Sequence, residues 1–240
     1  MKPVADPQDD RIGGDGLCEE DYESVFDPER IMTMGWTPRV FVYPSFLSEA
    51  ECDHFIARGL KKGLERSRVV HDRQSESGTI RTSEGTFLGD DGDEISRRVE
   101  QRMAQWTQLP LEHGEHFYIL RYSPGQEYKE HWDFFDPQLP EVRDPNAPGQ
   151  RIMTILVYLN APTSGGETSF PGLGLNIHAT RGTAVLFHNV RPDHRIDTQA
   201  LHAGQPVKEG IKWCLTKWFR ERTDHQRRSL ENPTDGLHYG

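Results

Sequence analysis

The pair His131 and Asp133 is the first place in the sequence where residue types and spacing point to metal chemistry. The segment around the pair is typical of a β-strand, in which side chains two positions apart share a face, so the imidazole and the carboxylate are expected to point the same way. On its own the pair is a weak signal, because most such pairs are hydrogen-bonded surface pairs, and His113 and Glu115 have the same spacing. The pair therefore needs a third partner.

His202, far along the chain, can supply that partner. A distal histidine that joins a His-x-Asp pair makes the 2-His-1-carboxylate triad, which binds Fe(II) on one side and leaves coordination positions open. Open positions are what an oxygen-activating enzyme requires. The three residues therefore indicate an iron site of that kind.

Lys212 lies ten residues after His202, in a predicted strand where Cys214, Thr216 and Trp218 share its face. If that face points inward, the ammonium requires an anion beside it, because a buried unpaired charge is strongly destabilising. The distal carboxylate of 2-oxoglutarate would serve. The alternative is a lysine at a strand end whose ammonium reaches solvent.

Two helices and a series of short strands must position these residues. Ser48 and Glu51 have capping-box spacing and precede apolar residues at helical intervals, which predicts a helix over 49–61, and a second apolar stripe predicts a helix over 93–107. After residue 115 the pattern changes to short β-branched and aromatic segments separated by Gly and Pro, which predict strands over 116–122, 127–135, 151–160, 175–179, 183–188 and 211–219. The sequence thus predicts a mainly β fold with flanking helices, in a barrel or jelly roll.

Composition narrows the class of protein. The chain has 240 residues, a net charge of -10 and 10% aromatic residues, which suits one large β-rich domain and excludes a wholly disordered chain. Its apolar stretches are too short to span a membrane, and its acidity argues against a nucleic-acid partner. Three cysteines without C-x-x-C spacing, and an N-terminus without an apolar signal segment, predict a cytoplasmic location.

Several ordered motifs between residues 40 and 221 resemble those of the prolyl 4-hydroxylase family among the Fe(II)/2-oxoglutarate dioxygenases. The most specific segments are 81–85, 122–133, 165–171, 201–207 and 212–218. The resemblance implies a double-stranded β-helix core, which is a jelly-roll, cupin-like fold. It also implies Fe(II), 2-oxoglutarate and O2 as cofactor and cosubstrates, with ascorbate as a reductant.

The resemblance assigns roles residue by residue. The catalytic Fe(II) ligands it implies are His131, Asp133 and His202. The residues it implies for 2-oxoglutarate are Lys212, Tyr122 and Thr168, and those for the substrate cleft are Arg81, Ser83, Tyr128, Arg151 and Trp218. Trp218 shares its strand face with Lys212, which supports its assignment. Tyr128 precedes His131 by three positions and is expected on the opposite face unless the strand bends.

The activity that the resemblance implies is hydroxylation of proline in a peptide or protein, of the procollagen-proline 4-dioxygenase type, coupled to decarboxylation of 2-oxoglutarate to succinate and CO2. An alternative with the same metal site is hydroxylation of free proline or another small metabolite, whose carboxylate Arg81 and Arg151 could bind. A remoter alternative is a non-catalytic peptide-binding protein on the same jelly roll. Gln205 stands where many relatives carry a cysteine, which argues against a secretory collagen-type or cell-wall role.

The domain organisation follows from the distribution of charge. Residues 1–30 hold ten acidic and three basic residues, so we expect 1–35 to be a flexible acidic arm, 36–225 a single catalytic dioxygenase domain and 226–240 a C-terminal tail. The long, Pro-rich connection 136–150 is interpreted either as a lid over the peptide or as a solvated insertion.

Other chemically capable residues are given structural interpretations. His178 and His188 lie in predicted strands, where a histidine that bonds to the backbone is the more common case. His113 and His116 could bind zinc only on a helix, whereas the residues after them predict a strand. Cys214 is expected to be a small core residue.

Overall fold

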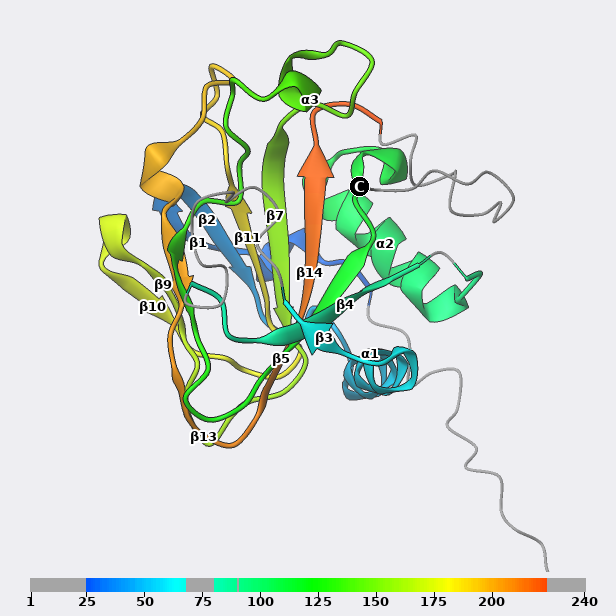
Figure 1. Ribbon diagram of the computed structural model, residues 1–240. Coiled ribbons are helices and arrows are strands. Elements are labelled where there is room, and N and C mark those ends of the chain that lie inside the picture. Colours follow the sequence, from blue (N-terminus) through cyan, green and yellow to red (C-terminus); the bar gives the residue numbers. More distant parts are fainter. Residues whose placement is uncertain (1–24, 68–79, 90, 224–240) are drawn as a thin grey trace, which may run out of the picture.

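Two facing antiparallel sheets and two long helices make up most of the described structure, and β8 and β13 form a separate two-stranded sheet (Figure 1). The computed structural model describes residues 25–67, 80–89 and 91–223. The larger sheet has eight strands in the order β1-β2-β11-β7-β14-β5-β4-β3, and the smaller has four in the order β10-β9-β12-β6. Helices α1 and α2 lie on the side of the large sheet away from the small one. This arrangement is the mainly β, helix-flanked jelly roll that the sequence predicts.

The elements have the following bounds. The helices are α1 (Glu49–Lys62), α2 (Glu94–Thr107) and the one-turn α3 (Pro140–Arg143), with 3-10 turns at Pro28–Arg30, Leu111–His113, Pro171–Leu173 and Thr198–Ala200. The strands are β1 (Met32–Trp36), β2 (Arg39–Tyr43), β3 (Glu65–Arg66), β4 (Glu84–Leu88), β5 (Phe117–Tyr122), β6 (Tyr128–His131), β7 (Arg151–Tyr158), β8 (Ser164–Gly165), β9 (Thr168–Phe170), β10 (Leu175–Ile177), β11 (Ala184–His188), β12 (His202–Gly204), β13 (Val207–Glu209) and β14 (Lys212–Arg220).

The two long helices begin where local sequence signals place them. Ser48 and Glu51 form a complete capping box, in which each side chain accepts a hydrogen bond from the other residue's backbone N–H. Asp93 caps α2 by accepting from the Ser96 N–H. Both predicted helices are confirmed to within one residue at each end.

Strand β14 separates two apolar cores. Alternate residues of a strand face opposite sides, so Leu215 and Phe219 pack in the core that α1 and α2 cover, whereas Cys214 and Trp218 pack between the two sheets. Lys217 lies on the helix side, where its ammonium donates to the Glu100 carboxylate of α2 at 2.7 Å. All nine residues of β14 are buried, and one strand therefore serves both cores.

Five of the six predicted strand segments are confirmed: 116–122, 151–160, 175–179, 183–188 and 211–219 correspond to β5, β7, β10, β11 and β14. The segment 127–135 is wrong beyond His131, where β6 ends. The sequence interpretation missed β1, β2 and β4 and the very short β3, β8, β9, β12 and β13. The last five have two or three residues each, too few for a period of two to be recognised.

The structure describes only part of the segments that the sequence assigns to an arm, a domain and a tail. Residues 1–24 of the expected arm and all of the expected tail lie outside the described residues. The end of the expected arm is ordered, because β1 pairs with β2 and the Asp27 N–H donates to the Tyr43 hydroxyl at 2.7 Å. The connection 136–150 contains α3, and at its two ends the Gln150 side chain bonds to the backbone of Phe135. Whether it closes as a lid stays a prediction.

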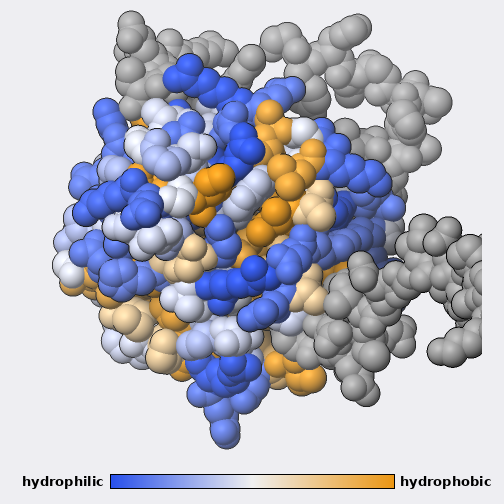
Figure 2. Space-filling view, turned by 90° about the horizontal axis from the view of Figure 1, so that it is seen from below, coloured by the Kyte–Doolittle hydropathy of each residue, from blue (hydrophilic) through white to orange (hydrophobic). Residues whose placement is uncertain are grey.

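Large apolar side chains reach the surface only in isolated groups. On the face seen from below, hydrophobic side chains form short rows among hydrophilic ones (Figure 2). The exposed side chains include Trp36 on β1 and Phe87 on β4. Within the described ranges, no helix combines the length and apolar character needed to cross a membrane.

Candidate active site

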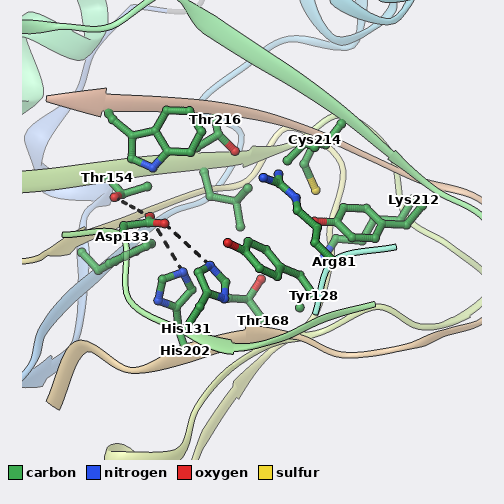
Figure 3. Close-up of a pocket in the computed structure, with 16 residues that line it drawn as sticks. Arg81, Tyr128, His131, Asp133, Thr154, Thr168, His202, Lys212, Cys214 and Thr216 are labelled. Carbon is green, nitrogen blue, oxygen red and sulfur yellow. Dashed lines mark hydrogen bonds and ion pairs between the residues drawn. The ribbon is translucent and has the colours of Figure 1, made fainter. Parts of the chain in front are cut away.

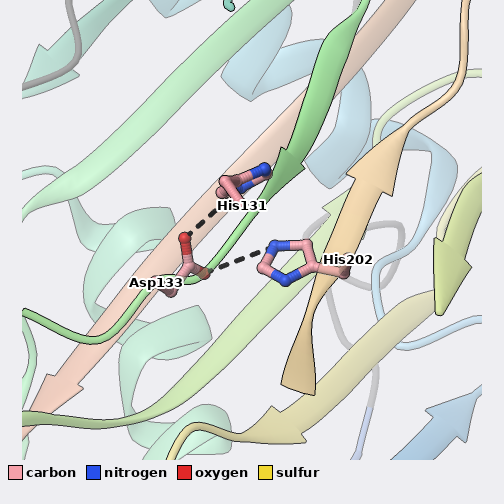
Figure 4. Close-up of side chains that lie close together, drawn as sticks. All are labelled: His131, Asp133 and His202. Atoms are coloured by element: carbon pink, nitrogen blue, oxygen red, sulfur yellow. Dashed lines mark ion pairs between the residues drawn. The ribbon is translucent and has the colours of Figure 1, made fainter. Parts of the chain in front are cut away.

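His131, Asp133 and His202 come together where β6 lies beside β12 (Figure 4). His202 is the antiparallel partner of His131, and Asp133 follows the end of β6. His131 Nε2 lies 3.6 Å from Asp133 Oδ1, and His202 Nε2 lies 3.8 Å from Asp133 Oδ2. The three possible ligand atoms all lie within 4.8 Å of one another, as a shared metal ion requires. In the described part of the chain this is the only group of three or more His, Cys, Asp or Glu residues so arranged.

The outer nitrogens of both imidazoles bond to backbone carbonyls. His131 Nδ1 lies 2.8 Å from the Lys129 oxygen, and His202 Nδ1 lies 3.0 Å from the Ala200 oxygen. A carbonyl only accepts, so each Nδ1 carries the proton and each Nε2 presents a lone pair. Burial, and then the neighbouring His202, lower the pKa of His131 well below its usual value, which keeps that ring neutral.

The carboxylate of Asp133 is charged. Burial by itself would raise its pKa, but the two imidazoles and the Arg151 guanidinium together lower it below the ordinary value. Two imidazole nitrogens and one carboxylate are a donor set that suits Fe(II). The residues present therefore fit the metal that the sequence indicates.

Lys212 lies in the same pocket as the triad, at its other end (Figure 3). Its residue is 3% exposed, and it shares the inner face of β14 with Cys214, Thr216 and Trp218, all of which line the pocket. Its ammonium lies 5.4 Å from the centre of the Tyr122 ring and 5.3 Å from that of Tyr158. Among the described residues it has no anionic partner. A buried ammonium in this state fits an anionic ligand.

Residues that carry hydroxyl groups line the same pocket as Lys212 or lie beside it. Tyr122 and Thr168 line the pocket as expected, and burial raises the pKa of Tyr122, so its hydroxyl remains a donor. The Tyr158 hydroxyl donates to Thr168 Oγ1 at 2.7 Å. Tyr158 was missed by sequence reasoning. Its even-numbered position on β7, in step with Thr154 and Leu156, is the signal that could have found it.

Tyr128 lies against the His-Asp-His cluster, because β6 is irregular, the one case in which the sequence does not predict the opposite face. The two rings stack with centroids 3.4 Å apart. His202 pairs with His131 and Gly204 pairs with Tyr128, so two steps along β12 match three along β6. This bulge adds one residue to β6 and brings Tyr128 to the side of His131.

Arg81 lies in the wall of the pocket, whereas Ser83 lies behind that wall. Arg81 lines the pocket, and its guanidinium lies over the ring of Tyr128 at 4.5 Å. Ser83 is fully buried and is not among the residues that line the pocket; its hydroxyl accepts from Arg81 Nε at 3.2 Å. The structure thus places Ser83 behind Arg81 rather than in the cleft.

Arg151 also differs from expectation. Its guanidinium donates to both carboxylate oxygens of Glu115 at 2.7 Å and lies 3.9 Å from the centre of the Trp218 ring. It does not line the pocket. Arg220 bonds to the same carboxylate. Glu115 was not predicted to take part in the site, and it occupies two of the donor groups of Arg151, Nε and Nη2, that a substrate carboxylate would use.

Trp218 lines the pocket from β14, and only 6% of the residue is exposed. Its indole Nε1–H is buried and has no hydrogen-bond partner among the described residues. An unpaired buried donor is unfavourable unless a ligand pairs with it. Trp218 therefore offers both a ring face and a donor to a bound molecule.

The remaining histidines and Cys214 lie in other surroundings. His113 Nδ1 lies 3.0 Å from the Arg220 carbonyl oxygen, and 82% of the His178 side chain is exposed. Burial lowers the pKa of His188 to about 4. Burial raises the pKa of Cys214, so its thiol is neutral in the pocket wall.

Comparison with known proteins gives a consistent family. The family model of the 2OG-Fe(II) oxygenase superfamily matches residues 117–220. Probable prolyl 4-hydroxylase 7 of Arabidopsis thaliana is 40% identical over 219 residues, which cover 82% of this chain and 67% of the relative. Probable prolyl 4-hydroxylase 6 of the same plant is 41% identical over 220 residues, covering 82% and 74%.

A solved structure is also similar. The viral collagen prolyl hydroxylase of Paramecium bursaria Chlorella virus-1, in complex with 2-oxoglutarate, aligns with a TM-score of 0.60 and 31% identity. The alignment covers 75% of this chain and 95% of the viral one.

Replacing His202 by alanine is expected to lower the affinity of the protein for Mn(II) by more than about 100-fold. Loss of a hydrogen-bonding partner of a ligand alone lowers metal affinity by about 10- to 100-fold, and loss of a ligand is more severe. Calorimetric titration of the chelator-treated full chain measures the effect. His178→Ala, on an exposed histidine, is the matched control, and equal losses in both variants would contradict the assignment.

Proposed function

The chain belongs to the prolyl 4-hydroxylase family of 2-oxoglutarate/Fe(II) oxygenases, and on that premise we propose that it hydroxylates proline within a peptide or protein. The observation that carries the proposal is a buried ammonium without an anion partner in the described residues, in the same pocket as a His-Asp-His cluster. When bound together, Fe(II), 2-oxoglutarate and O2 supply the oxidation that converts a C–H bond to C–OH, with release of succinate and CO2.

The metal would be held by Nε2 of His131, Nε2 of His202 and the carboxylate of Asp133. Backbone carbonyls hold both rings in the tautomer that presents this nitrogen. No rotation of either imidazole is needed to bring its lone pair toward the carboxylate.

The cosubstrate would place its distal carboxylate at Lys212. A carboxylate there would pair with the ammonium in a pocket that Tyr122 and Thr168 also line. Because Thr168 Oγ1 accepts from Tyr158, its own proton is available to donate to an anion. The pocket can thus replace the water that a carboxylate loses on burial.

The substrate would be held by aromatic faces and a single indole donor. A proline within a peptide has no backbone N–H, so its recognition depends on ring contact and on its neighbours' carbonyl oxygens. Tyr128 and Trp218 provide ring faces in the pocket, and the Trp218 Nε1–H suits a peptide carbonyl. Specificity then comes from the placement of one C–H bond near the metal.

Free proline is the weaker candidate substrate. Its carboxylate requires a free cation, and Arg151, one of the two arginines considered for that role, is already paired with Glu115. Arg81 lies over the rings of Tyr118 and Tyr128 and donates to Ser83, and no carboxylate pairs with it among the described residues. The pairing of Arg151 leaves Arg81 as the one arginine of the two that a small carboxylate could reach, which favours a peptide over a free amino acid.

The proposal also includes a cytoplasmic location and a single catalytic domain. Cys52 and Cys214 are free and buried, which supports a reducing compartment such as the cytoplasm. The described sheets and helices belong to one packed unit, which supports a single catalytic domain within residues 36–225.

The direct test is turnover of proline peptides. The iron-loaded full chain with 2-oxoglutarate is expected to add one oxygen atom to a proline-rich peptide and to form succinate in step with it, measured by mass spectrometry. Free L-proline is the comparison substrate. Succinate formation that free proline stimulates more strongly than any peptide would contradict the proposal.

Replacing Lys212 by alanine is expected to raise the KM for 2-oxoglutarate by at least about 100-fold, because loss of one partner of a buried ion pair costs about 3–5 kcal/mol. Mn(II) affinity should change little, since Lys212 lies at the other end of the pocket from the triad. Steady-state kinetics and metal titration separate the two effects. Lys208→Ala, on an exposed lysine of β13, is the control; a parallel loss of metal in the Lys212 variant would refute the assigned role.

A further inference from the structure

The carboxylate of Asp133 is held by a chain of two polar side chains outside the triad. Thr154 Oγ1 donates to Asp133 Oδ2 at 2.8 Å (Figure 3), and Asn189 Nδ2 donates to Thr154 Oγ1 at 3.0 Å. Thr154 is 1% exposed and Asn189 is fully buried. Neither residue is indicated by the sequence motifs. The role of these two hydrogen bonds therefore requires a separate explanation.

The direction of these bonds is fixed by their chemistry. An amide nitrogen only donates, so the Asn189 amide occupies a lone pair of the Thr154 hydroxyl. A charged carboxylate only accepts, so the single hydroxyl proton of Thr154 is directed at Asp133. Asn189 thus sets the orientation of a hydroxyl that would otherwise rotate.

Both side chains are mounted on rigid strands. Thr154 pairs with Phe187 of β11 and with Trp218 of β14, and both partners line the pocket. Asn189 follows β11, and its backbone N–H donates to the Ile152 oxygen of β7 at 2.9 Å. The hydroxyl that faces Asp133 therefore has little freedom to move.

Asn189 has a buried polar atom without a partner in the described structure, which lowers the stability of the fold. Its side-chain oxygen Oδ1 is buried and has no hydrogen-bond partner among the described residues. A leucine of similar volume would leave no polar atom unpaired, and a buried unpaired acceptor is destabilising. The amide nitrogen, rather than the fold, accounts for an asparagine at this position.

We propose that Thr154, oriented by Asn189, is a positioning residue that holds the Asp133 carboxylate between the two imidazoles and so sets the metal affinity. The inference rests on the proposed metal site and deepens it. Thr154 bonds to Oδ2, the oxygen nearer His202, and thereby fixes the rotation of the carboxylate.

The test uses Thr154→Val, which keeps the shape and removes the hydroxyl. Its affinity for Mn(II), measured by calorimetry on the chelator-treated full chain, is expected to fall by about 10- to 100-fold. Thr154→Ser restores the donor and is expected to recover most of the affinity. Thr183→Val, at another buried threonine that does not line the pocket, is the control and should bind as the wild type.

Asn189→Ala provides the second arm. It should weaken Mn(II) binding in the wild-type background and cause no further loss when Thr154 is already valine. Unchanged affinity in a folded Thr154→Val variant, a serine variant no better than valine, or additive losses with Asn189→Ala would each overturn the inference. A wild-type chain that binds no divalent metal would instead refute the proposed function.

A different observation concerns the aromatic side chains beside Trp218 of the pocket wall. Phe87 on β4 is 45% exposed, and its ring centroid lies 4.5 Å from that of Tyr118 and 6.4 Å from that of Trp218. Tyr118 and Trp218 are themselves 5.9 Å apart and nearly buried. Phe87 therefore extends to solvent an aromatic group that includes Trp218 of the pocket wall.

The rings of Tyr118, Trp218 and Phe87 differ in whether a guanidinium lies over them. Arg81 lies over Tyr118 at 5.2 Å and Arg151 over Trp218 at 3.9 Å, whereas within the described ranges no cation lies over Phe87. The exposed ring of Phe87 is thus apolar and uncharged. It suits a second apolar ring rather than a charged side chain.

We infer that Phe87 forms an outer subsite, which binds a second proline of the peptide close to the one that is hydroxylated. A proline-rich segment is a stiff extended helix with a rise of about 3.1 Å per residue, so a proline two positions from the target lies about 6 Å along the helix. The Trp218 and Phe87 rings are 6.4 Å apart, so two such prolines can engage both rings at small entropic cost. This inference rests on the proposed function and names its substrate class more closely.

Two peptides of equal length test the subsite, one with prolines and one with serines flanking the target proline. The Phe87→Ala variant is expected to lose about 3- to 10-fold of the wild-type preference for the proline-flanked peptide, expressed as the ratio of kcat/KM values. Trp36→Ala, at an exposed ring on β1 at the other edge of the sheet, is the control and should keep the preference. A preference unchanged in Phe87→Ala would overturn the inference, whereas wild-type failure on both peptides would contradict the proposed function.

Discussion

The pairing of β6 with β12 is the constraint on which the site depends. It places His202 directly opposite His131 and leaves Asp133 just beyond the strand end, so residues distant along the chain present three ligand atoms within 4.8 Å of one another. The bulge in the same pair brings Tyr128 onto the ring of His131. A shift of one residue in this register would turn the imidazole of His202 to the other face of the small sheet and dissolve the cluster.

The large sheet supplies the other wall of the pocket. Its strand β14 carries one buried lysine on each face. On the helix side of β14, Lys217 is paired with Glu100 and contributes to the structure. On the inner side, Lys212 lies beside the rings of Tyr122 and Tyr158 and has no anionic partner in the described structure. The same alternation that builds two cores therefore separates a lysine that is paired within the fold from one that faces the pocket.

The side chains around the triad also divide into those that are paired within the protein and those with a group that has no hydrogen-bonding or charged partner in the described structure. Arg151 is paired with Glu115, and Asn189 and Thr154 direct one hydrogen bond at Asp133, so these side chains are engaged with other protein groups. Within the described residues, the Trp218 indole donor is engaged by no hydrogen bond and the exposed Phe87 ring by no cation. Ring faces and a single donor suit a peptide that contains proline.

The sequence by itself determined the two helices, through caps and apolar periodicity, and the shared face of Lys212, Cys214, Thr216 and Trp218, because alternation along a regular strand is a local property. It also indicated the three members of the triad by type and spacing. Only the tertiary structure decided the face of Tyr128, the withdrawal of Ser83 and Arg151 from the pocket wall, and the contacts of Thr154, Asn189 and Tyr158. Bulges, strand order and long-range hydrogen bonds depend on which strand lies beside which, and that choice is made by the packing of the whole chain rather than by any one segment.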